Sequence, residues 1–427
     1  MKDIKKTLFM KEAASGKSHN ILVEICIAIL LFFIASVAMG LVQIPALTAY
    51  LLSNEDYMSM ILTGRLDTQK MLSVLSNMPE WIMIVMLFAE ILLTLIVMLY
   101  CRFFEKRKFS TLGFVKKGMV KQYLTGLIAG AAAFSIAYLL CLATGSIKCE
   151  GIATDISPLY IIGYFMGYLL QGMAEEVLCR GYLMVSLSRR YHVTLAIAAS
   201  SLFFAFLHSS NSGLSLLAYV NLFLFGVFAS LLLLDFGNIW IASAFHSIWN
   251  FVQGNIYGVQ VSGLNVTNSI LSTSYTDGME FINGGAFGME GGLAVTLVFI
   301  AGIALLGRHL YKKGAIVDIN ITGQEAYSRQ SVQADSSEEP GQATGSTVTI
   351  KQPMPDINTQ EQEANIFQET GVPEETDINN NIIINKDADV LDSEVIKNNN
   401  ASIPADGDTG RQGSVQQTSF DESYFKD

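Results

Sequence analysis

At residues 171–180 the sequence is QGMAEEVLCR, from Gln171 to Arg180, within an apolar run at residues 158–187 that is long enough to span a membrane. Charged groups at that depth cost ~2.5–3.5 kcal/mol each even on the lenient insertion scale, so they are kept only where they pair or do chemistry. On a helix, Glu176 and Arg180 stand at i and i+4 and can pair, whereas Glu175 lies about 100° away. Glu175 is therefore the free carboxylate and the first candidate for an active residue.

The composition indicates an integral membrane protein. Of the 427 residues, 51% are hydrophobic, and the mean hydropathy of +0.39 exceeds that of an ordinary soluble domain. The net charge of −11 is unevenly distributed, because residues 318–427 hold 21 acidic and 6 basic residues, a net charge of −15. The rest has 17 acidic and 21 basic residues, a net charge of +4. We expect a lipid bilayer as a partner and no nucleic acid.

The predicted fold is all-α: a polytopic membrane protein with about eight transmembrane helices. Residues 1–20 form a basic flank, residues 21–313 the transmembrane body, and residues 314–427 an acidic tail with too little apolar surface to order itself. The first apolar run is too long for a signal-peptide core, so we interpret it as an uncleaved anchor. The eight expected helices are residues 21–41, 81–100, 123–144, 158–187, 194–207, 214–234, 239–256 and 289–306.

Basic residues predict the orientation of these helices. Lysines and arginines cluster in the N-terminal flank and after the second, fourth and eighth predicted helices, whereas residues 257–288 contain none. Because cytoplasmic loops are enriched in these residues, both termini and the acidic tail are predicted to be cytoplasmic, in a multi-pass protein of the cell membrane. The loop at residues 257–288 is expected on the outer side.

Two further helices carry polar residues at helical spacing. His208 ends the fifth predicted helix four residues after Phe204, and His246 and Asn250 share one face of the seventh. A carboxylate and an imidazole can activate a water, while a second imidazole and an amide can stabilise an oxyanion. Glu175, His208, His246 and Asn250 together therefore have the groups that peptide-bond hydrolysis requires.

Each of these residues also has a structural interpretation. The Glu176–Arg180 pair is more often structural than catalytic, an intramembrane histidine more often packs or forms a hydrogen bond, and Asn250 alone would link two helices. Glu24 and Glu90, in other apolar runs, are interpreted as near-interface or pairing residues. Two further sets are assigned to packing: the glycines Gly126 and Gly130, and the five cysteines, Cys26, Cys101, Cys141, Cys149 and Cys179.

Three ordered motifs resemble those of the CPBP intramembrane protease family, which includes type II CAAX prenyl proteases and bacterial Abi proteins linked to bacteriocin immunity. They are Glu175-Glu176-x-x-x-Arg180, Phe204-x-x-x-His208 and His246-x-x-x-Asn250, within residues 158–256. The resemblance implies an endopeptidase in which Glu175 activates water with His208. It places His246 and Asn250 on the oxyanion side, and Glu176, Arg180 and Phe204 in support.

Several alternatives remain open at this level. The family has been called metalloprotease, and Glu175, His208 and His246 could bind zinc, but there is no HExxH and the metal-free mechanism is favoured. A proton- or ion-coupled transporter or channel subunit would use the same buried ionisable residues, and a non-catalytic immunity or scaffold protein would keep them unused. The substrate would be a CAAX protein or a peptide precursor. The sequence also leaves open how Glu175 and His208 reach one depth.

Overall fold

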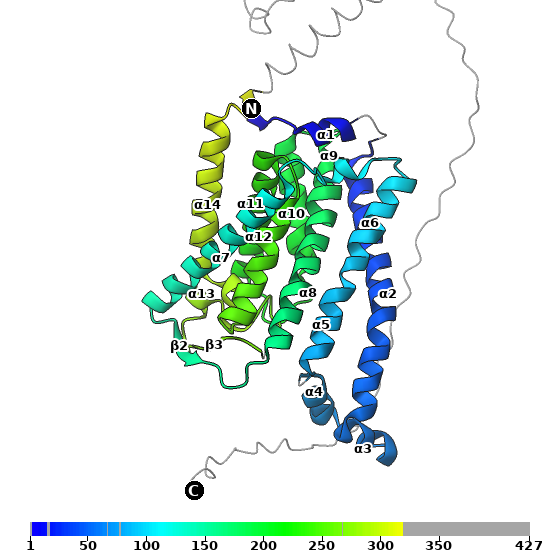
Figure 1. Ribbon diagram of the computed structural model, residues 1–427, viewed down its shortest axis with the longest axis vertical. Coiled ribbons are helices and arrows are strands. Elements are labelled where there is room, and N and C mark those ends of the chain that lie inside the picture. The colour runs from blue at the N-terminus through cyan, green and yellow to red at the C-terminus, as the bar shows by residue number, and fades with distance from the viewer. Residues whose placement is uncertain (1, 15–17, 66, 77, 267, 319–427) are drawn as a thin grey trace, which may run out of the picture. The chain divides into compact units, whose positions relative to one another are not determined.

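The computed structural model describes residues 2–14, 18–65, 67–76, 78–266 and 268–318, all within one compact unit (Figure 1). The predicted tail lies outside the described residues, except that the described structure continues to Asp318. The main helices, in chain order, are α2 (Ile21–Ser53), α5 (Glu80–Ala89), α6 (Ile91–Phe103), α7 (Met119–Ala143), α8 (Pro158–Glu176), α9 (Val185–Ser188), α10 (Val193–Leu207), α11 (Leu216–Phe236), α12 (Trp240–Phe251) and α14 (Leu293–Lys312).

These helices account for all eight predicted segments. Helices α5 and α6 are nearly continuous, with a break at Glu90. The π-helical stretch Val177–Met184 joins α8 to α9, and another, Val252–Ile256, extends α12. Five of the described segments are long and apolar enough to cross a membrane: Ile21–Ser53, Glu80–Phe103, Met119–Ala143, Leu216–Phe236 and Leu293–Lys312. The prediction of a mostly helical, polytopic membrane protein is confirmed.

The boundaries differ most at α2, which continues twelve residues past the predicted end at residue 41. Its 33 residues would be ~50 Å long at 1.5 Å per residue, well beyond a hydrocarbon core of about 30 Å. Pro45 stands inside this helix, where it has no N–H to donate and leaves the carbonyl four residues earlier without its helical bond. Beyond α2, two short helices, α3 (Glu55–Thr63) and α4 (Thr68–Ser76), lead to α5 (Figure 1).

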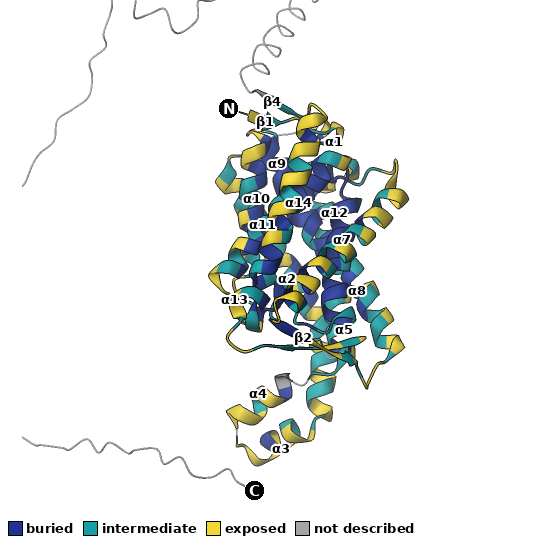
Figure 2. Ribbon diagram, turned by 90° about the vertical axis from the view of Figure 1, so that its left-hand side faces the viewer, coloured by how far each residue is buried: buried dark blue, intermediate teal, exposed yellow. Residues whose placement is uncertain are grey.

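Two small sheets lie at opposite ends of the helix bundle, and neither was predicted. Strands β1 (Lys2–Ile4) and β4 (Ile316–Asp318) pair antiparallel at one end, near helix α1 (Leu8–Ala13). Strands β2 (Ile147–Ile152) and β3 (Leu271–Tyr275) pair at the other end, beside the short helix α13 (Glu280–Asn283) (Figures 1 and 2). The first sheet therefore holds the residues before the first span and those after the last one together.

The basic clusters that the sequence assigned to one side of the membrane meet at the end of the bundle that carries β1 and β4. The carboxylate of Glu105 contacts Arg107 at 3.1 Å and Arg189 at 2.7 Å, although these arginines follow different helices. Asp3 accepts hydrogen bonds from the backbone of Val193 and Thr194 and so caps the start of α10. These contacts agree with a single face for the basic loops and the N-terminal flank.

Close helix packing at the bundle centre depends on glycines. Gly126 and Gly130 of α7 face α12, where an added Cβ would meet the carbonyl oxygens of Ile241 and Phe245 at 2.5 Å. Gly172 of α8 likewise faces α12, because its Cβ would lie 2.7 Å from the backbone nitrogen of Ser247. The predicted packing role of Gly126 and Gly130 is thus confirmed. Gly172, one turn before Glu176, brings α8 close to the helix that carries His246.

Candidate active site

Glu175 and His208 lie at one depth because of where their helices begin and end. Residues 158–188 form one helical run, and Glu175 lies 13 residues before its end at Ser188. His208 follows the last residue of α10, 15 residues after Val193. At 1.5 Å per residue these spans are ~20 and ~22 Å, measured from the two neighbouring ends that join α9 to α10. The open question of depth is resolved because α10 begins at Val193, soon after this run ends at Ser188, so both residues lie at about the same distance from the turn between them.

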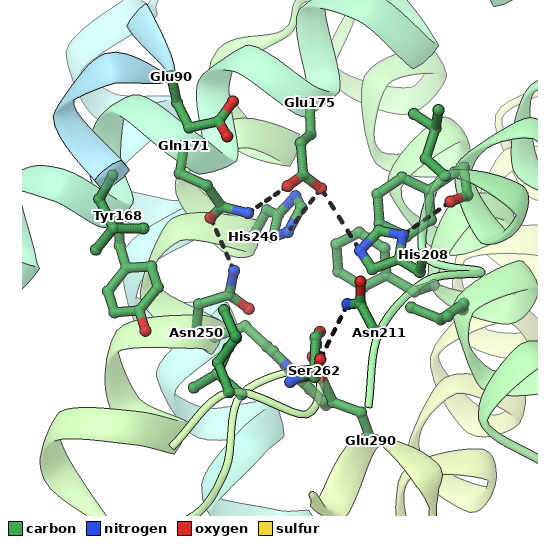
Figure 3. Close-up of a pocket in the computed structure, with 18 of the residues that line it drawn as sticks. Glu90, Tyr168, Gln171, Glu175, His208, Asn211, His246, Asn250, Ser262 and Glu290 are labelled. Carbon is green, nitrogen blue, oxygen red and sulfur yellow. Dashed lines mark hydrogen bonds and ion pairs between the residues drawn. The ribbon is translucent and has the colours of Figure 1, made fainter. Parts of the chain in front are cut away.

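Three helices bring the predicted residues around one carboxylate oxygen. Oε2 of Glu175 lies 3.9 Å from Nε2 of His208 and 3.8 Å from Nε2 of His246 (Figure 3). These separations exceed direct hydrogen bonds, and a water on the cavity side would be positioned to bridge the atoms. The same oxygen is buried and has no hydrogen-bond partner among the described residues. It is therefore the oxygen of Glu175 that is free to act on a small molecule.

Both imidazoles turn Nε2 toward Glu175, while Nδ1 of each ring contacts another acceptor. Nδ1 of His208 is 2.9 Å from the carbonyl oxygen of Phe204, and Nδ1 of His246 is 3.1 Å from Oε1 of Glu176. Because a carbonyl and a carboxylate can only accept, each Nδ1 carries the hydrogen. In a neutral imidazole Nε2 is then an acceptor, and in an imidazolium it donates. The contact from Glu176 fixes the orientation of the His246 ring.

Glu176 and Arg180 form the expected ion pair beneath this group. Nη1 of Arg180 donates to Oε1 of Glu176 at 2.9 Å, and both side chains are fully buried. The guanidinium carbon lies 4.5 Å from the ring centre of Phe204 and 5.6 Å from that of Phe225. Arginine over aromatic faces is a stabilising arrangement when it is withdrawn from water. The predicted supporting residues thus pack directly under the catalytic candidates.

Asn250 reaches the group through a residue that the sequence analysis did not assign. Its Nδ2 donates to Oε1 of Gln171 at 2.9 Å, and Nε2 of Gln171 donates to Oε1 of Glu175 (Figure 3). All four predicted catalytic residues therefore converge on one place. The spacing of Gln171, one turn before Glu175 on the same helix, was the signal that could have identified it.

A cavity of about 280 Å³ opens onto these residues. Apolar side chains make up slightly more than half of its described lining residues, and most of them come from α2, α5, α6, α10, α11, α12 and α14. Its outer wall includes Ser262, whose N–H and hydroxyl both donate to Oε2 of Glu290, and Asn211, whose amide donates to the carbonyl of Ser262. Glu90 also lines the cavity, on the side of Glu175 (Figure 3). Asn211, Ser262 and Glu290 were not assigned from the sequence, and Glu90 was interpreted there as a near-interface or pairing residue rather than as part of a site.

The residues do not form a metal site in this arrangement. Tetrahedral zinc with bonds near 2.0–2.1 Å holds its ligand atoms about 3.3 Å apart. Oε2 of Glu175 lies 3.9 Å from Nε2 of His208 and 3.8 Å from Nε2 of His246, which is wider than this spacing. Among the described residues, no group of three or more histidine, cysteine or acidic side chains is arranged to hold a metal ion. The zinc-binding hypothesis for Glu175, His208 and His246 therefore finds no support in the geometry.

Residues 157–252 match the family model described as type II CAAX prenyl endopeptidase Rce1-like. This match confirms the resemblance predicted from the motifs. The Rce1-like segment contains Glu175, Glu176, Arg180, Phe204, His208, His246 and Asn250. At the level of the family it indicates a CAAX-type protease within the membrane. No curated protein with a matching sequence was found.

Proposed function

We propose that the chain is an intramembrane endopeptidase in which Glu175 activates a water for attack on a peptide carbonyl. The observation that carries the proposal is the buried Oε2 of Glu175, which has no hydrogen-bond partner among the described residues and lies 3.8–3.9 Å from two imidazole nitrogens. A water that bridges Glu175 and His208 from the cavity side would direct its hydrogens at these acceptors and a lone pair into the cavity.

The proton transfers follow from the hydrogen bonds of the two histidines. The water donates to Oε2 of Glu175 and to Nε2 of neutral His208, and Glu175 removes its proton as the oxygen bonds to the carbonyl carbon. When both nitrogens of His246 carry a proton, Nδ1 donates to Glu176 and Nε2 donates to the developing oxyanion. When the C–N bond breaks, the proton on Glu175 passes to the leaving amine.

The lining of the cavity bears on the kind of substrate. Among the described lining residues, three carry carboxyl groups, Glu90, Glu175 and Glu290, and none is a lysine or arginine. Acidic residues next to the cleaved bond are therefore disfavoured, whereas an apolar or uncharged segment fits the mainly apolar walls. We propose a membrane-associated peptide or protein of the CAAX type, or a peptide precursor, as the substrate, and a location in the cell membrane with both termini cytoplasmic.

The decisive experiment is cleavage by the purified protein in liposomes. The probes are a farnesylated CAAX peptide and an apolar peptide of the same length without the prenyl group. Glu175→Gln retains the shape of the side chain but not the base, so the cleavage rate should fall by at least ~10²-fold, the lower end for loss of a general base. The thermal midpoint should stay near that of the wild type. Full cleavage of either probe by Glu175→Gln would reject the proposal and favour an ion relay or a scaffold.

A further inference from the structure

Gln171 connects two of the proposed catalytic groups without belonging to any of the three motifs. Its amide nitrogen donates to Oε1 of Glu175, and its amide oxygen accepts from Nδ2 of Asn250 at 2.9 Å. Figure 3 shows this amide lying between the two side chains, at the edge of the cavity. One side chain on α8 thereby bridges its own helix to α12 next to the site where the substrate would bind.

The direction of both bonds is determined by the ionised carboxylate. A carboxylate can only accept hydrogen bonds, so Gln171 must turn its NH₂ group toward Glu175. The carbonyl of Gln171 then faces Asn250 and can only accept, so Asn250 must turn its own NH₂ group toward Gln171. The opposite orientation of either amide would place two acceptors against each other. The charge on Glu175 therefore sets the orientation of an amide two residues away in the hydrogen-bond chain.

We propose that Gln171 is a positioning residue for the hydrolysis, a role that depends on the proposed function. It occupies Oε1 of Glu175, so that Oε2, which faces the two imidazoles, is the oxygen that receives the water. It also leaves Asn250 with one remaining Nδ2 hydrogen and its carbonyl oxygen for the substrate peptide group. Without Gln171, the carboxylate and the amide each gain rotational freedom, and the site has no preferred pair of reacting atoms.

Two variants test this role in the liposome cleavage assay. Gln171→Met removes both hydrogen bonds with a side chain of similar length. Gln171→Glu keeps the shape and an acceptor for Asn250 but cannot donate to Glu175 as a carboxylate. We expect kcat to fall by about 10- to 100-fold in both, because misplacement of reacting groups by ~1 Å can cost 10²-fold. The KM should stay within about threefold, since the rest of the cavity is unchanged.

Gln69→Met is the control, because Gln69 is an exposed residue of α4 and is not among the described residues that line the cavity. This variant should retain the wild-type kcat. If Gln171 only fills space, Gln171→Met and Gln171→Glu will both keep kcat within threefold of the wild type, and the inference is overturned. If Glu175→Gln is inactive in the same assay, that outcome rejects the positioning role of Gln171 but leaves the proposed hydrolysis standing. An active Glu175→Gln rejects the proposed hydrolysis itself, whatever the Gln171 variants show.

Discussion

Replacing Glu176 by glutamine isolates the role of its charge from that of its shape. Glutamine keeps Oε1, which can still accept from Nδ1 of His246, so the histidine keeps its partner. The guanidinium of Arg180 loses its only charged partner among the described residues. It is fully buried, and its Nε and Nη2 already have no hydrogen-bond partner among those residues.

The expected cost follows from this burial. Removing one partner of a buried ion pair costs ~3–5 kcal/mol, because the remaining charge stays desolvated. The rings of Phe204 and Phe225 contact Arg180 in both proteins, so they do not offset the loss. A typical protein is stable by only about 5–15 kcal/mol. Glu176→Gln should therefore lower both the free energy of unfolding and the yield of folded protein.

The second substitution, Arg180→Met, should restore part of the stability. An apolar side chain of similar length removes the unpaired charge and packs against the same two rings. Unfolding of the purified variants in a detergent titration measures each free energy, and the double-mutant cycle gives the coupling between the two residues. The control is Glu150→Gln, an exposed carboxylate on β2, which should change the stability by less than about 0.5 kcal/mol. A Glu176→Gln protein as stable as the wild type would refute the buried-pair argument.

Three further predictions concern topology, packing and the C-terminal boundary. A variant that retains Cys149, exposed on β2, as its only cysteine should react with a membrane-impermeant maleimide in intact cells. If Cys149 reacts only after the cells are lysed, the predicted topology with cytoplasmic termini is reversed. Gly130→Ala should lower the thermal midpoint, because its Cβ would lie 2.5 Å from both the carbonyl oxygen of Phe245 and Cγ2 of Ile248. Gly307→Ala is the control, because its Cβ would have nothing within 4 Å, and its midpoint should match or exceed that of the wild type. Equal midpoints for the two variants would contradict the close packing of α7 against α12. Truncation after Asp318 should leave the unfolding midpoint unchanged, whereas truncation after Lys313 removes β4, the partner of β1, and should lower the midpoint. A lower midpoint for the protein that ends at Asp318 would assign a structural role to the acidic tail.

The sequence by itself determined the helical class, the eight segments and the four residues proposed for catalysis. Hydropathy is a local property, so apolar runs identify helices without knowledge of their neighbours. The i,i+4 pairing of Glu176 with Arg180 was also predictable, because both residues lie on one helix. The glycine pair on α7 indicated a packing face for the same reason, although its partner, α12, was unknown.

Only the tertiary structure decided which polar atoms meet. The contacts of Glu175 with His208 and His246 join three helices, and that of Glu176 with His246 joins residues 70 positions apart. Such contacts depend on helix length, tilt and rotation, which no single helix encodes. The packing of α10 against Val177–Met184 and α9 set the common depth of Glu175 and His208. Gln171 precedes Glu175 by one helical turn in the sequence. Its proposed role became visible only because Nδ2 of Asn250, on α12, lies 2.9 Å from its amide oxygen.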